Sequence, residues 1–537
     1  MFSPTDPRSD LPASLDPLDR VAIGYLCLPL VIFLVGWFEW WAALPLVACT
    51  LYALRPLIAR WPAAGTRLPV TPLQLAVAVL IGCGWSILGG TDHLVFTNAD
   101  WHIRDAVLHD LVNSPWPVGY GLLDGKETLL RAPLAYFLPA ALVGKVAGLS
   151  MAHLAMAVWT AMGATLFLLQ VLSLTRSRVG IAVVVAVVVV FFSGLDIVGS
   201  LLNDGPRFRT DWNITTHLEW WAGLYQYSSM TTQLFWVPNH ALAGWLIIGL
   251  LYRDDRFTGI DTLLPILVVA AALWSPLTAI GLLPFVAWKA GAHMLQQHSL
   301  RLLHPKVWAP ALMVGLPVAG FLTLDPTNIK KGLALSHDGF GDFVMDLLRQ
   351  AQFFLLEAGF IGLAILAIRR SSEVALALLI LAVLPFAYLG PGNDLVMRAS
   401  IPSLAVLAIG ASLSLVEKAA DARGMRKKVV LGGLLAIGAV TSVAEFARAV
   451  VLPAWPINLR ATLIGADCGR FPPHYVARLG DESIGHLLRH PNRISLGPQG
   501  PGACDNPAYE LMWRDNPFVI QRNKGLKPIS PNGRRQT

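Results

Sequence analysis

Long apolar runs separated by short polar connectors make up most of the chain. The runs at 180–192 and 374–390 contain no charged residue. Runs of this length and hydropathy are typical of helices that cross a lipid bilayer. The pattern predicts about fourteen helices of spanning or near-spanning length. They lie at 21–39, 41–54, 72–90, 132–149, 151–174, 180–199, 238–252, 262–274, 277–290, 308–323, 351–368, 374–390, 402–416 and 428–446.

The composition also places the chain in a membrane. Of its 537 residues, 55% are hydrophobic and only 14% are charged, and the mean hydropathy is +0.57. A soluble protein of this length needs far more charge to cover its surface. The net charge of +7, from 41 Lys and Arg against 34 Asp and Glu, serves topology in such a protein and is poor evidence for a nucleic-acid partner. We therefore expect an all-α, multi-pass protein of the cell (inner or plasma) membrane.

Two clusters of basic residues orient the chain, because connectors rich in Lys and Arg stay in the cytoplasm. One cluster follows the second predicted helix, and the other precedes the last one. They consist of Arg55, Arg60 and Arg67, and of Arg423, Arg426, Lys427 and Lys428. Alternation from these two points predicts four large or polar connectors outside the cell, at 91–131, 200–237, 324–350 and 391–401.

Counting crossings from the first basic cluster and counting them from the second place the chain between residues 131 and 151 on opposite sides of the membrane. One segment there therefore does not cross the membrane. The segment 132–149 contains two prolines and Lys145, which favour a re-entrant or interfacial helix. Without it, about thirteen crossings remain. The predicted domains are a cytoplasmic tail at 1–20, a transmembrane domain at 21–446 and an extracytoplasmic segment at 447–537. That last segment contains Cys468 and Cys504, which can pair in an oxidising compartment.

The first candidate site is the segment 97–112, which begins the first long external connector. A helix starting near Asp100 places His102, Asp105 and His109 at positions i, i+3 and i+7, on one face. Such a face can hold a divalent metal, Mg²⁺ or Mn²⁺, or supply a base beside an acceptor hydroxyl. The alternative is a solvated amphipathic helix on the membrane, with Asp100 as a partner of the helix dipole.

The second candidate site is the external turn at 392–402, which contains Asn393, Asp394 and Arg398. An arginine at the membrane surface suits a lipid phosphate, because its planar fork donates two parallel hydrogen bonds. The alternative is an interfacial arginine that reaches toward lipid headgroups, with Asp394 as its i,i+4 partner.

The third candidate is His240, in the segment 233–245 where an external connector returns to the membrane. Its alternative is an ordinary helix start, capped by Asn239, with a buried histidine. Lys330 and Lys331, in the connector 324–350, are further cations that can face a phosphate. The predicted spans contain almost no ionisable residue, which counts against an ion-coupled transporter with a site at the bilayer midplane.

This layout resembles the GT-C superfamily of membrane glycosyltransferases. Asp100, in NADWHIRD, matches the place of the family's catalytic acid in the first external loop, and Asp105 matches a second acid of that loop. The stretch RAPLAYFLPAALVGKVAGLS at 131–150 is similar to the Pro-Leu-aromatic segment that follows the loop in some members. Arg398 matches a late external arginine on the carrier phosphate. The chain departs from the pattern in having no adjacent Asp-Glu pair and two helices before the loop.

The resemblance implies transfer of a sugar from a polyprenyl-phosphate carrier to a lipid or glycan acceptor by single inverting displacement. Asp100 would act on the acceptor hydroxyl, and Asp105 with His102 or His109 would hold a metal or orient the acceptor. Arg398, helped by Lys330 or Lys331, would offset the charge of the departing phosphate. The alternatives are a lipid-linked glycan flippase or transporter, an O-antigen polymerase or ligase, and a non-catalytic assembly partner.

Overall fold

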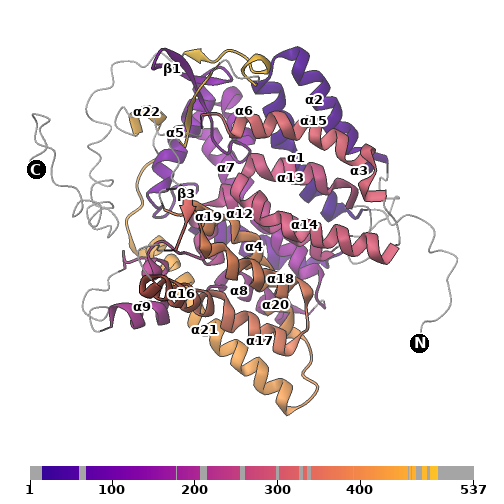
Figure 1. Cartoon of the computed structure of the whole chain (residues 1–537), viewed down its shortest axis with the longest axis vertical. Coiled ribbons are helices and arrows are strands. Elements are labelled where there is room, and N and C mark those ends of the chain that lie inside the picture. The colour runs from indigo at the N-terminus through magenta and orange to yellow at the C-terminus, as the bar shows by residue number, and fades with distance from the viewer. Residues whose placement is uncertain are drawn as a thin grey trace, which may run out of the picture.

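A computed structural model describes most of the chain up to residue 493. The described residues are 15–59, 68–176, 178–205, 214–253, 261–297, 301–325, 331–335, 340–390, 392–457, 459–460, 462–466, 474–480 and 484–493. Helices dominate this part of the chain, with a few short strands at one end (Figure 1). Lys330, Cys468 and Cys504 lie outside the described residues, so the predictions that concern them stay predictions.

Seven helical segments in the described residues are long and apolar enough to cross a membrane. They are α1 (Pro17–Trp37), α7 (Leu149–Ser173), α8 (Val179–Phe191) with most of α9 (Asp196–Asp204), α15 (Pro305–Leu322), α16 (Phe340–Phe354) with α17 (Phe360–Ile368), α19 (Asp394–Ala399) with α20 (Ile401–Val416), and α21 (Ala422–Val451). The prediction of a helical membrane protein is therefore supported, while the count of thirteen crossings is not confirmed.

Shorter helices and strands complete the described fold. The remaining helices are α2 (Trp40–Ala53), α3 (Arg55–Ala59), α4 (Pro72–Leu88), α5 (Asp100–Asn113), α6 (Leu138–Ala147), α11 (Met230–Trp236), α12 (Pro238–Arg253), α13 (Leu264–Trp274), α14 (Pro276–Gln297), α18 (Ser372–Val383) and α22 (Leu463–Ala466). The strands are β1 (Val118–Leu123), β2 (Lys126–Leu130), β3 (Lys331–Leu333), β4 (Ala387–Leu389), β5 (Val476–Arg478) and β6 (Asn492–Arg493). Turns of 3-10 helix lie at Leu218–Ala222, Asp261–Leu263, Arg301–Leu303, Leu384–Phe386 and Gly485–Leu487, and a π-helical turn lies at Leu355–Gly359.

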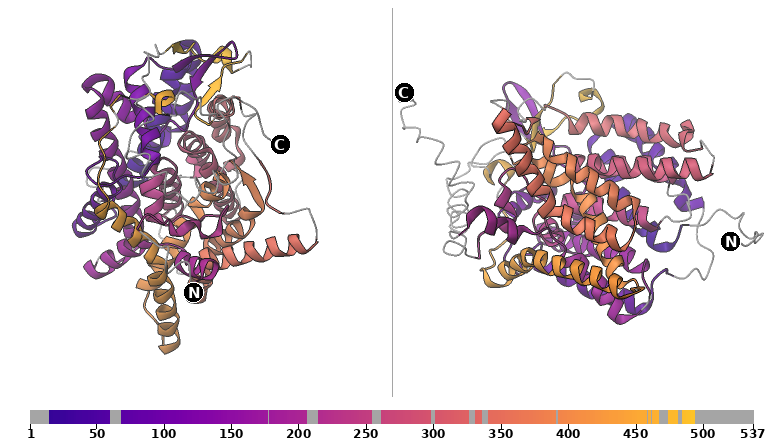
Figure 2. Two further views of the ribbon diagram at one scale, coloured as in Figure 1. Left: turned by 90° about the vertical axis from the view of Figure 1, so that its left-hand side faces the viewer. Right: turned by 60° about the horizontal axis from the view of Figure 1, so that its bottom comes forward.

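The helices run side by side and give the bundle two distinct ends (Figures 1 and 2). We call them the α5 end, at the left of Figure 1, and the α3 end, at the right. At the α3 end, Arg253 at the end of α12 pairs with Asp19 at 2.7 Å and with Asp16, beside the start of α1. At the α5 end, the carbonyl of Trp37 accepts a hydrogen bond from the backbone N–H of Arg489, at 2.9 Å. The first helix and the described tail therefore meet at the α5 end.

The tail adds strands to a hairpin that follows α5. Strands β1 and β2 pair antiparallel, β5 pairs with β2 and β6 pairs with β1, in the order β5-β2-β1-β6. The side chain of Arg478 on β5 contacts Asp124 at 2.9 Å and Asp325 at 2.7 Å. Two connectors that the sequence predicts to be external and the tail are thus held together by one arginine.

Helix α6 occupies the segment where the two topology counts disagree. At about 1.5 Å per residue, its 10 residues are too short to cross a bilayer. The Tyr136 hydroxyl, just before α6, lies 2.6 Å from the Thr160 hydroxyl, about three turns into α7. The chain then turns at Gly148, which has a positive φ of 89°, and continues as α7. Helix α6 therefore returns along the first part of α7, the geometry expected of the non-spanning helix predicted at 132–149.

Helices α13 and α14 occupy the predicted segments 262–274 and 277–290 and are separated by one residue. Helix α13 has 11 residues and ends at Trp274, whose indole donates to the carbonyl of Leu26 in the middle of α1. Ser275 breaks the helix, and Pro276 begins α14, which packs back against α13. Because proline lacks the N–H that would continue α13, the break is encoded locally.

The bundle contains buried acids, two of which lie in segments that the sequence predicts to span the membrane. Asp196, Glu219 and Glu357 are all buried. Asp196 accepts hydrogen bonds of 2.8 Å from Ser193 and from Thr441 of α21. These acids lie at interruptions of the helices: Asp196 begins α9 and Glu357 lies in the π-helical turn. A hydropathy window averages over such positions and hides them.

Candidate functional site

Helix α5 begins at Asp100, as the sequence predicts, and its first turn is tied to the bundle. The side-chain oxygen of Asn98 accepts from the backbone N–H of Asp100 at 3.1 Å, and its amide donates to the carbonyl of Phe235 at 2.7 Å. The indole of Trp101 donates to the same carbonyl at 3.0 Å. Because three hydrogen bonds converge here, the start of α5 is fixed against the end of α11.

Asp100 is the accessible acid of this helix. Its side chain is 45% exposed and pairs with Nη2 of Arg104 at 3.2 Å. Arg104 itself is only 4% exposed, and its guanidinium lies 5.4 Å from the ring of Trp101. Its Nε and Nη1 have no hydrogen-bond partner among the described residues. A buried cation with open donors is costly in a folded protein, so this arrangement suits an anionic ligand.

Arg398 lies in a second cluster that joins two separately predicted segments. Its Nε donates to Nε2 of His240 at 2.9 Å, and its Nη1 contacts Asp394 at 2.6 Å. Nδ1 of His240 lies 2.7 Å from the hydroxyl of Ser275, at the break between α13 and α14. The side chains of Arg398 and Asp394 remain partly exposed. The cluster therefore presents a positioned guanidinium where three helices begin or break.

Tyr475, in the tail, connects the two clusters. Burial raises the pKa of its hydroxyl, and Arg104, Asp100, Arg398 and Asp394 all act on it electrostatically. Arg104 and Arg398 also both interact electrostatically with the ring of His240. Asp100 and Arg104 of α5 and Asp394 and Arg398 of α19 are therefore all within electrostatic range of one residue of the tail.

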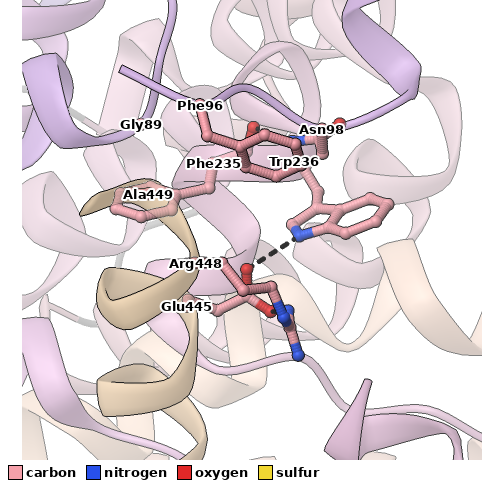
Figure 3. Close-up of a pocket in the computed structure, with 8 residues that line it drawn as sticks. All are labelled: Gly89, Phe96, Asn98, Phe235, Trp236, Glu445, Arg448 and Ala449. Atoms are coloured by element: carbon pink, nitrogen blue, oxygen red, sulfur yellow. Dashed lines mark hydrogen bonds and ion pairs between the residues drawn. The ribbon is translucent and has the colours of Figure 1, made fainter. Parts of the chain in front are cut away.

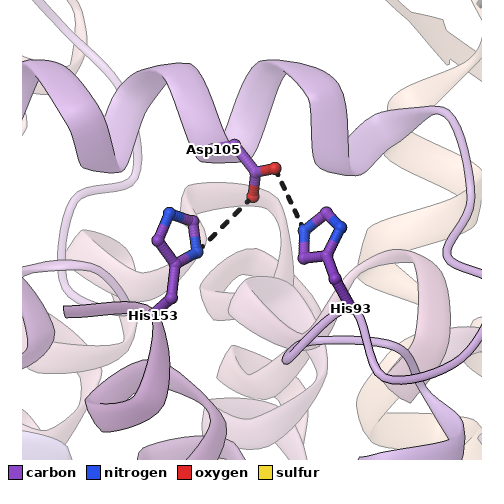
Figure 4. A group of neighbouring side chains, drawn as sticks. All are labelled: His93, Asp105 and His153. Atoms are coloured by element: carbon purple, nitrogen blue, oxygen red, sulfur yellow. Dashed lines mark ion pairs between the residues drawn. The ribbon is translucent and has the colours of Figure 1, made fainter. Parts of the chain in front are cut away.

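Asp105 has a different environment from Asp100, although both are on α5. It is completely buried. Its Oδ2 lies 3.0 Å from Nε2 of His93, in the loop before α5, and its Oδ1 lies 3.9 Å from Nδ1 of His153, near the start of α7 (Figure 4). The two histidines flank the carboxylate from opposite sides, as Figure 4 shows. This carboxylate cannot reach an acceptor in solvent, and it contributes to holding α5 against the bundle.

His102 and His109, the other members of the predicted metal face, have separate surroundings. His102 is buried, which lowers its pKa, while the nearby Asp105 acts in the opposite direction. His109 lies 3.0 Å from Asp110, whose other oxygen accepts from Tyr120 at 2.9 Å. Asp110 thus links α5 to β1.

The four predicted metal ligands Asp100, His102, Asp105 and His109 do not converge on one point. Among the described residues, one group of three metal-ligating side chains has its donor atoms within 4.8 Å of one another, and it consists of His93, Asp105 and His153. The Mg²⁺ or Mn²⁺ ion expected on the α5 face therefore does not fit the residues predicted to hold it.

The remaining predicted residues surround the turn that precedes α19. Lys331 is exposed on β3, and its backbone pairs with Leu389 of β4. Asn393 is buried with a positive φ of 55°, and its side chain accepts from the N–H of Leu389 at 3.4 Å. Asn393 therefore shapes the turn, whereas Lys331 is brought close to the turn with its side chain in solvent.

A small cavity lies beneath the start of α5 (Figure 3). Three of its eight lining residues are aromatic, and one of them, Trp236, donates from its indole to Glu445 at 3.1 Å. Glu445 also pairs with Arg448, which donates to the carbonyl of Thr216 at 2.8 Å. The lining residues are Gly89, Phe96, Asn98, Phe235, Trp236, Glu445, Arg448 and Ala449. The cavity therefore separates the α5 site from an ion pair on α21.

Several residues of these clusters had no local signal in the sequence. His93 and His153 belong to elements other than α5, and His153 lies in an apolar helix where a lone histidine looks structural. Tyr475 comes from the distant tail. Arg104 did have a signal, since it follows Asp100 by one helical turn and can pair with it.

Comparison of the chain with protein-family models, with curated proteins and with solved structures finds no match. The functional argument therefore rests on the residues and geometry described above.

Proposed function

We propose that this protein is a multi-pass membrane glycosyltransferase. It would move a sugar from a polyprenyl-phosphate carrier to a lipid or glycan acceptor at the external face of the membrane. The observation that carries the proposal is the gathering of a half-exposed acid, Asp100, with two arginines, Arg104 and Arg398, around Tyr475. This reaction needs an accessible carboxylate that accepts the proton of the acceptor hydroxyl. It also needs cations that offset the charge of the departing phosphate.

The proposed orientation places the α3 end in the cytoplasm and the α5 end outside. The basic connectors at Arg55 and at Arg423 to Lys428 support it, because such connectors remain in the cytoplasm. In this orientation α6 and the pair α13–α14 enter the membrane and return. The crossings are then α1, α2, α4, α7, α8, α12, α15, α16 with α17, α18, α20 and α21. The number of crossings thus changes from about thirteen to about eleven.

Asp100 would act on the acceptor. Its carboxylate accepts the proton of the acceptor hydroxyl while that oxygen attacks the anomeric carbon of the sugar. The bond between the anomeric carbon and the phosphate oxygen breaks, and the electron pair leaves with the polyprenyl phosphate. Because attack and departure occur on opposite faces, the configuration at the anomeric carbon inverts. Asp105 is too deeply buried to share this role and would position α5 instead.

Arg398 and Arg104 would bind the phosphate. Arg398 is partly exposed and its direction is fixed by His240 and Asp394, so it can meet the phosphate without reorganising. Arg104 has two donor atoms without partners among the described residues, and these can be directed to a phosphate oxygen. Lys331, exposed on β3, would add positive charge at the entrance.

The test measures transfer from a radiolabelled polyprenyl-phosphate sugar pool by the purified full-length protein in nanodiscs. Asp100→Asn should lower the transfer rate at least about 100-fold, because the general base is removed. Asp346→Asn is the matched control, since Asp346 is an acid of another helix, α16, where it pairs with Arg349. Wild-type activity in both Asp100→Asn and Arg398→Ala would refute the proposed site.

A second candidate function is a proton-coupled transporter of a lipid-linked glycan. The buried acids Asp196, Glu219 and Glu357 favour it, because ionisable groups inside a membrane protein commonly mark coupling sites. This reading predicts that carrier moves between leaflets of sealed vesicles without sugar transfer. It also predicts that Glu357→Gln abolishes movement while Asp100→Asn leaves it intact. Transfer that depends on Asp100 would instead support the glycosyltransferase.

A further inference from the structure

We infer that His93, Asp105 and His153 form a binding site for one transition-metal ion, with Zn²⁺ the best match. The three side chains come from the loop before α5, from α5 and from α7. Two imidazoles and one carboxylate are a donor set that favours zinc and its first-row neighbours over Mg²⁺, which prefers oxygen ligands alone. The inference does not depend on the proposed function.

The distances match ligands that share an ion. Nε2 of His93 and Oδ2 of Asp105 are 3.0 Å apart, and Nδ1 of His153 and Oδ1 of Asp105 are 3.9 Å apart. Ligand atoms on one tetrahedral zinc ion lie roughly 3.3 Å from one another, because each bond is about 2.0–2.1 Å long. The observed separations lie on both sides of this value. The second separation is too long for a hydrogen bond, so without an ion it is a weak contact.

His153 provides the observation that most requires a ligand. It is almost completely buried, and neither of its ring nitrogens has a hydrogen-bond partner among the described residues. Leaving a buried imidazole without partners costs free energy comparable to a lost hydrogen bond or more. An ion bound between Nδ1 of His153 and the Asp105 carboxylate would give this imidazole a partner.

The surroundings of His93 match those of a metal-bound histidine. Its Nδ1 lies 3.1 Å from the carbonyl of Trp455 and must carry a proton to donate to it. Nε2, on the side facing Asp105, is then the nitrogen that can carry a lone pair. Metal-bound histidines typically donate their other N–H to a carbonyl or carboxylate in this way. The ring of Trp455 also packs edge-on against His93, at 4.8 Å between ring centroids, and shields this side.

The main alternative is a metal-free pair of imidazolium and carboxylate. The pKa of His93 supports that alternative, since the hydrogen bond and charge of Asp105 outweigh burial and raise it. In that case His93 and Asp105 satisfy each other, but the buried ring of His153 has no hydrogen-bond partner among the described residues. A metal ion accounts for all three side chains, and this is why we favour it.

The experiment measures the metal content of the full-length protein, purified through a tag without histidine, by inductively coupled plasma mass spectrometry. Wild-type protein should carry about one zinc ion per chain after incubation with Zn²⁺ and removal of the excess. His93→Gln and His153→Gln should lower the metal content at least about tenfold. His109→Gln is the matched control, because His109 pairs with Asp110 outside the group and should keep the ion.

Cobalt keeps the inference testable if the glutamine variants do not fold. Co²⁺ in a site of two histidines and one carboxylate gives visible d–d absorption, which the wild-type protein should show at one equivalent and lose on adding Zn²⁺. Wild-type protein that binds neither ion in stoichiometric amount would refute the site. Folded His153→Gln protein with undiminished metal content would refute it as well.

Discussion

Arg398 donates a hydrogen bond of 2.9 Å from its Nε to Nε2 of His240, and so joins the short helix α19 to the first turn of α12. Because a guanidinium only donates, Nε2 must carry the lone pair, and the proton on Nδ1 is directed to Ser275 at 2.7 Å. Ser275 is the residue that breaks α13 from α14. Arg398 thus sets the tautomer of His240, and the serine hydroxyl at the helix break holds the ring that positions this arginine.

Replacing Arg398 by lysine should therefore lower activity although the charge is kept. A lysine cannot donate to His240 and to a phosphate as a rigid fork, so the charge developing on the leaving phosphate would be poorly matched. We expect kcat for sugar transfer to fall about 10- to 100-fold with a smaller change in KM. Arg349→Lys, at an exposed position on α16, should leave both constants unchanged. Equal rates for Arg398→Lys and wild type would contradict the role of the planar fork.

Arg104→Met should separate stability from donor binding. Arg104 is buried with two donor atoms that lack partners among the described residues, and its partner Asp100 is 45% exposed, so removing the cation does not leave a buried carboxylate without a partner. We expect a melting temperature no lower than that of wild type in thermal unfolding. Meanwhile, KM for the polyprenyl-phosphate donor should rise at least about tenfold. A lower melting temperature with unchanged KM would show that Arg104 is structural.

Because of Glu219, we expect the protein to lose stability as the pH rises from neutral to weakly alkaline. Burial, with the nearby Asp196, raises its pKa to about 8, whereas the pKa of a glutamate in the unfolded chain is about 4.3. Between these values the folded protein keeps a proton that the unfolded chain releases, so raising the pH favours unfolding. This contribution is lost progressively up to pH 8 and changes little above it.

The useful window for this test is pH 7 to 8. His217 has the opposite effect on stability at lower pH. Burial lowers its pKa to about 3, so stability rises with pH until the histidine of the unfolded chain, whose pKa is about 6.5, has lost its proton. Melting temperatures measured from pH 7 to 8 should fall more steeply for wild type than for Glu219→Gln. A parallel decline in both proteins would show that other groups cause the pH dependence.

The longer helices were largely predictable from hydropathy. The segments predicted at 151–174 and 402–416 correspond to α7, Leu149–Ser173, and α20, Ile401–Val416. Hydropathy reports whether a segment is apolar but carries no information on how deep it enters the bundle. The runs at 262–274 and 277–290 therefore looked like two crossings, whereas the structure has the broken pair α13–α14. The pairing of β5 with β2 joins segments far apart in the chain, and three-residue strands leave almost no local pattern.

The candidate site was predictable where it depends on one helix and not where it depends on several. The start of α5 at Asp100 followed from the sequence. The grouping of His102, Asp105 and His109 by spacing alone did not identify a metal site, because a helical face can be buried against other elements. Asp105 instead meets His93 and His153, and only the tertiary packing of the loop before α5 and of α7 brings those histidines to it.

Thiol accessibility should decide which end of the bundle faces the outside. Leu94, in the loop before α5, is 72% exposed, and Lys418, just after α20, is exposed at the opposite end. Single cysteines at these positions, in a background with the five native cysteines replaced, can be labelled in intact cells with a membrane-impermeant maleimide. We expect Leu94→Cys to react in intact cells and Lys418→Cys to react only after permeabilisation, because the basic connectors retain the α3 end in the cytoplasm. The reverse pattern would place Asp100 and Arg398 in the cytoplasm and would exclude a reaction at the external face.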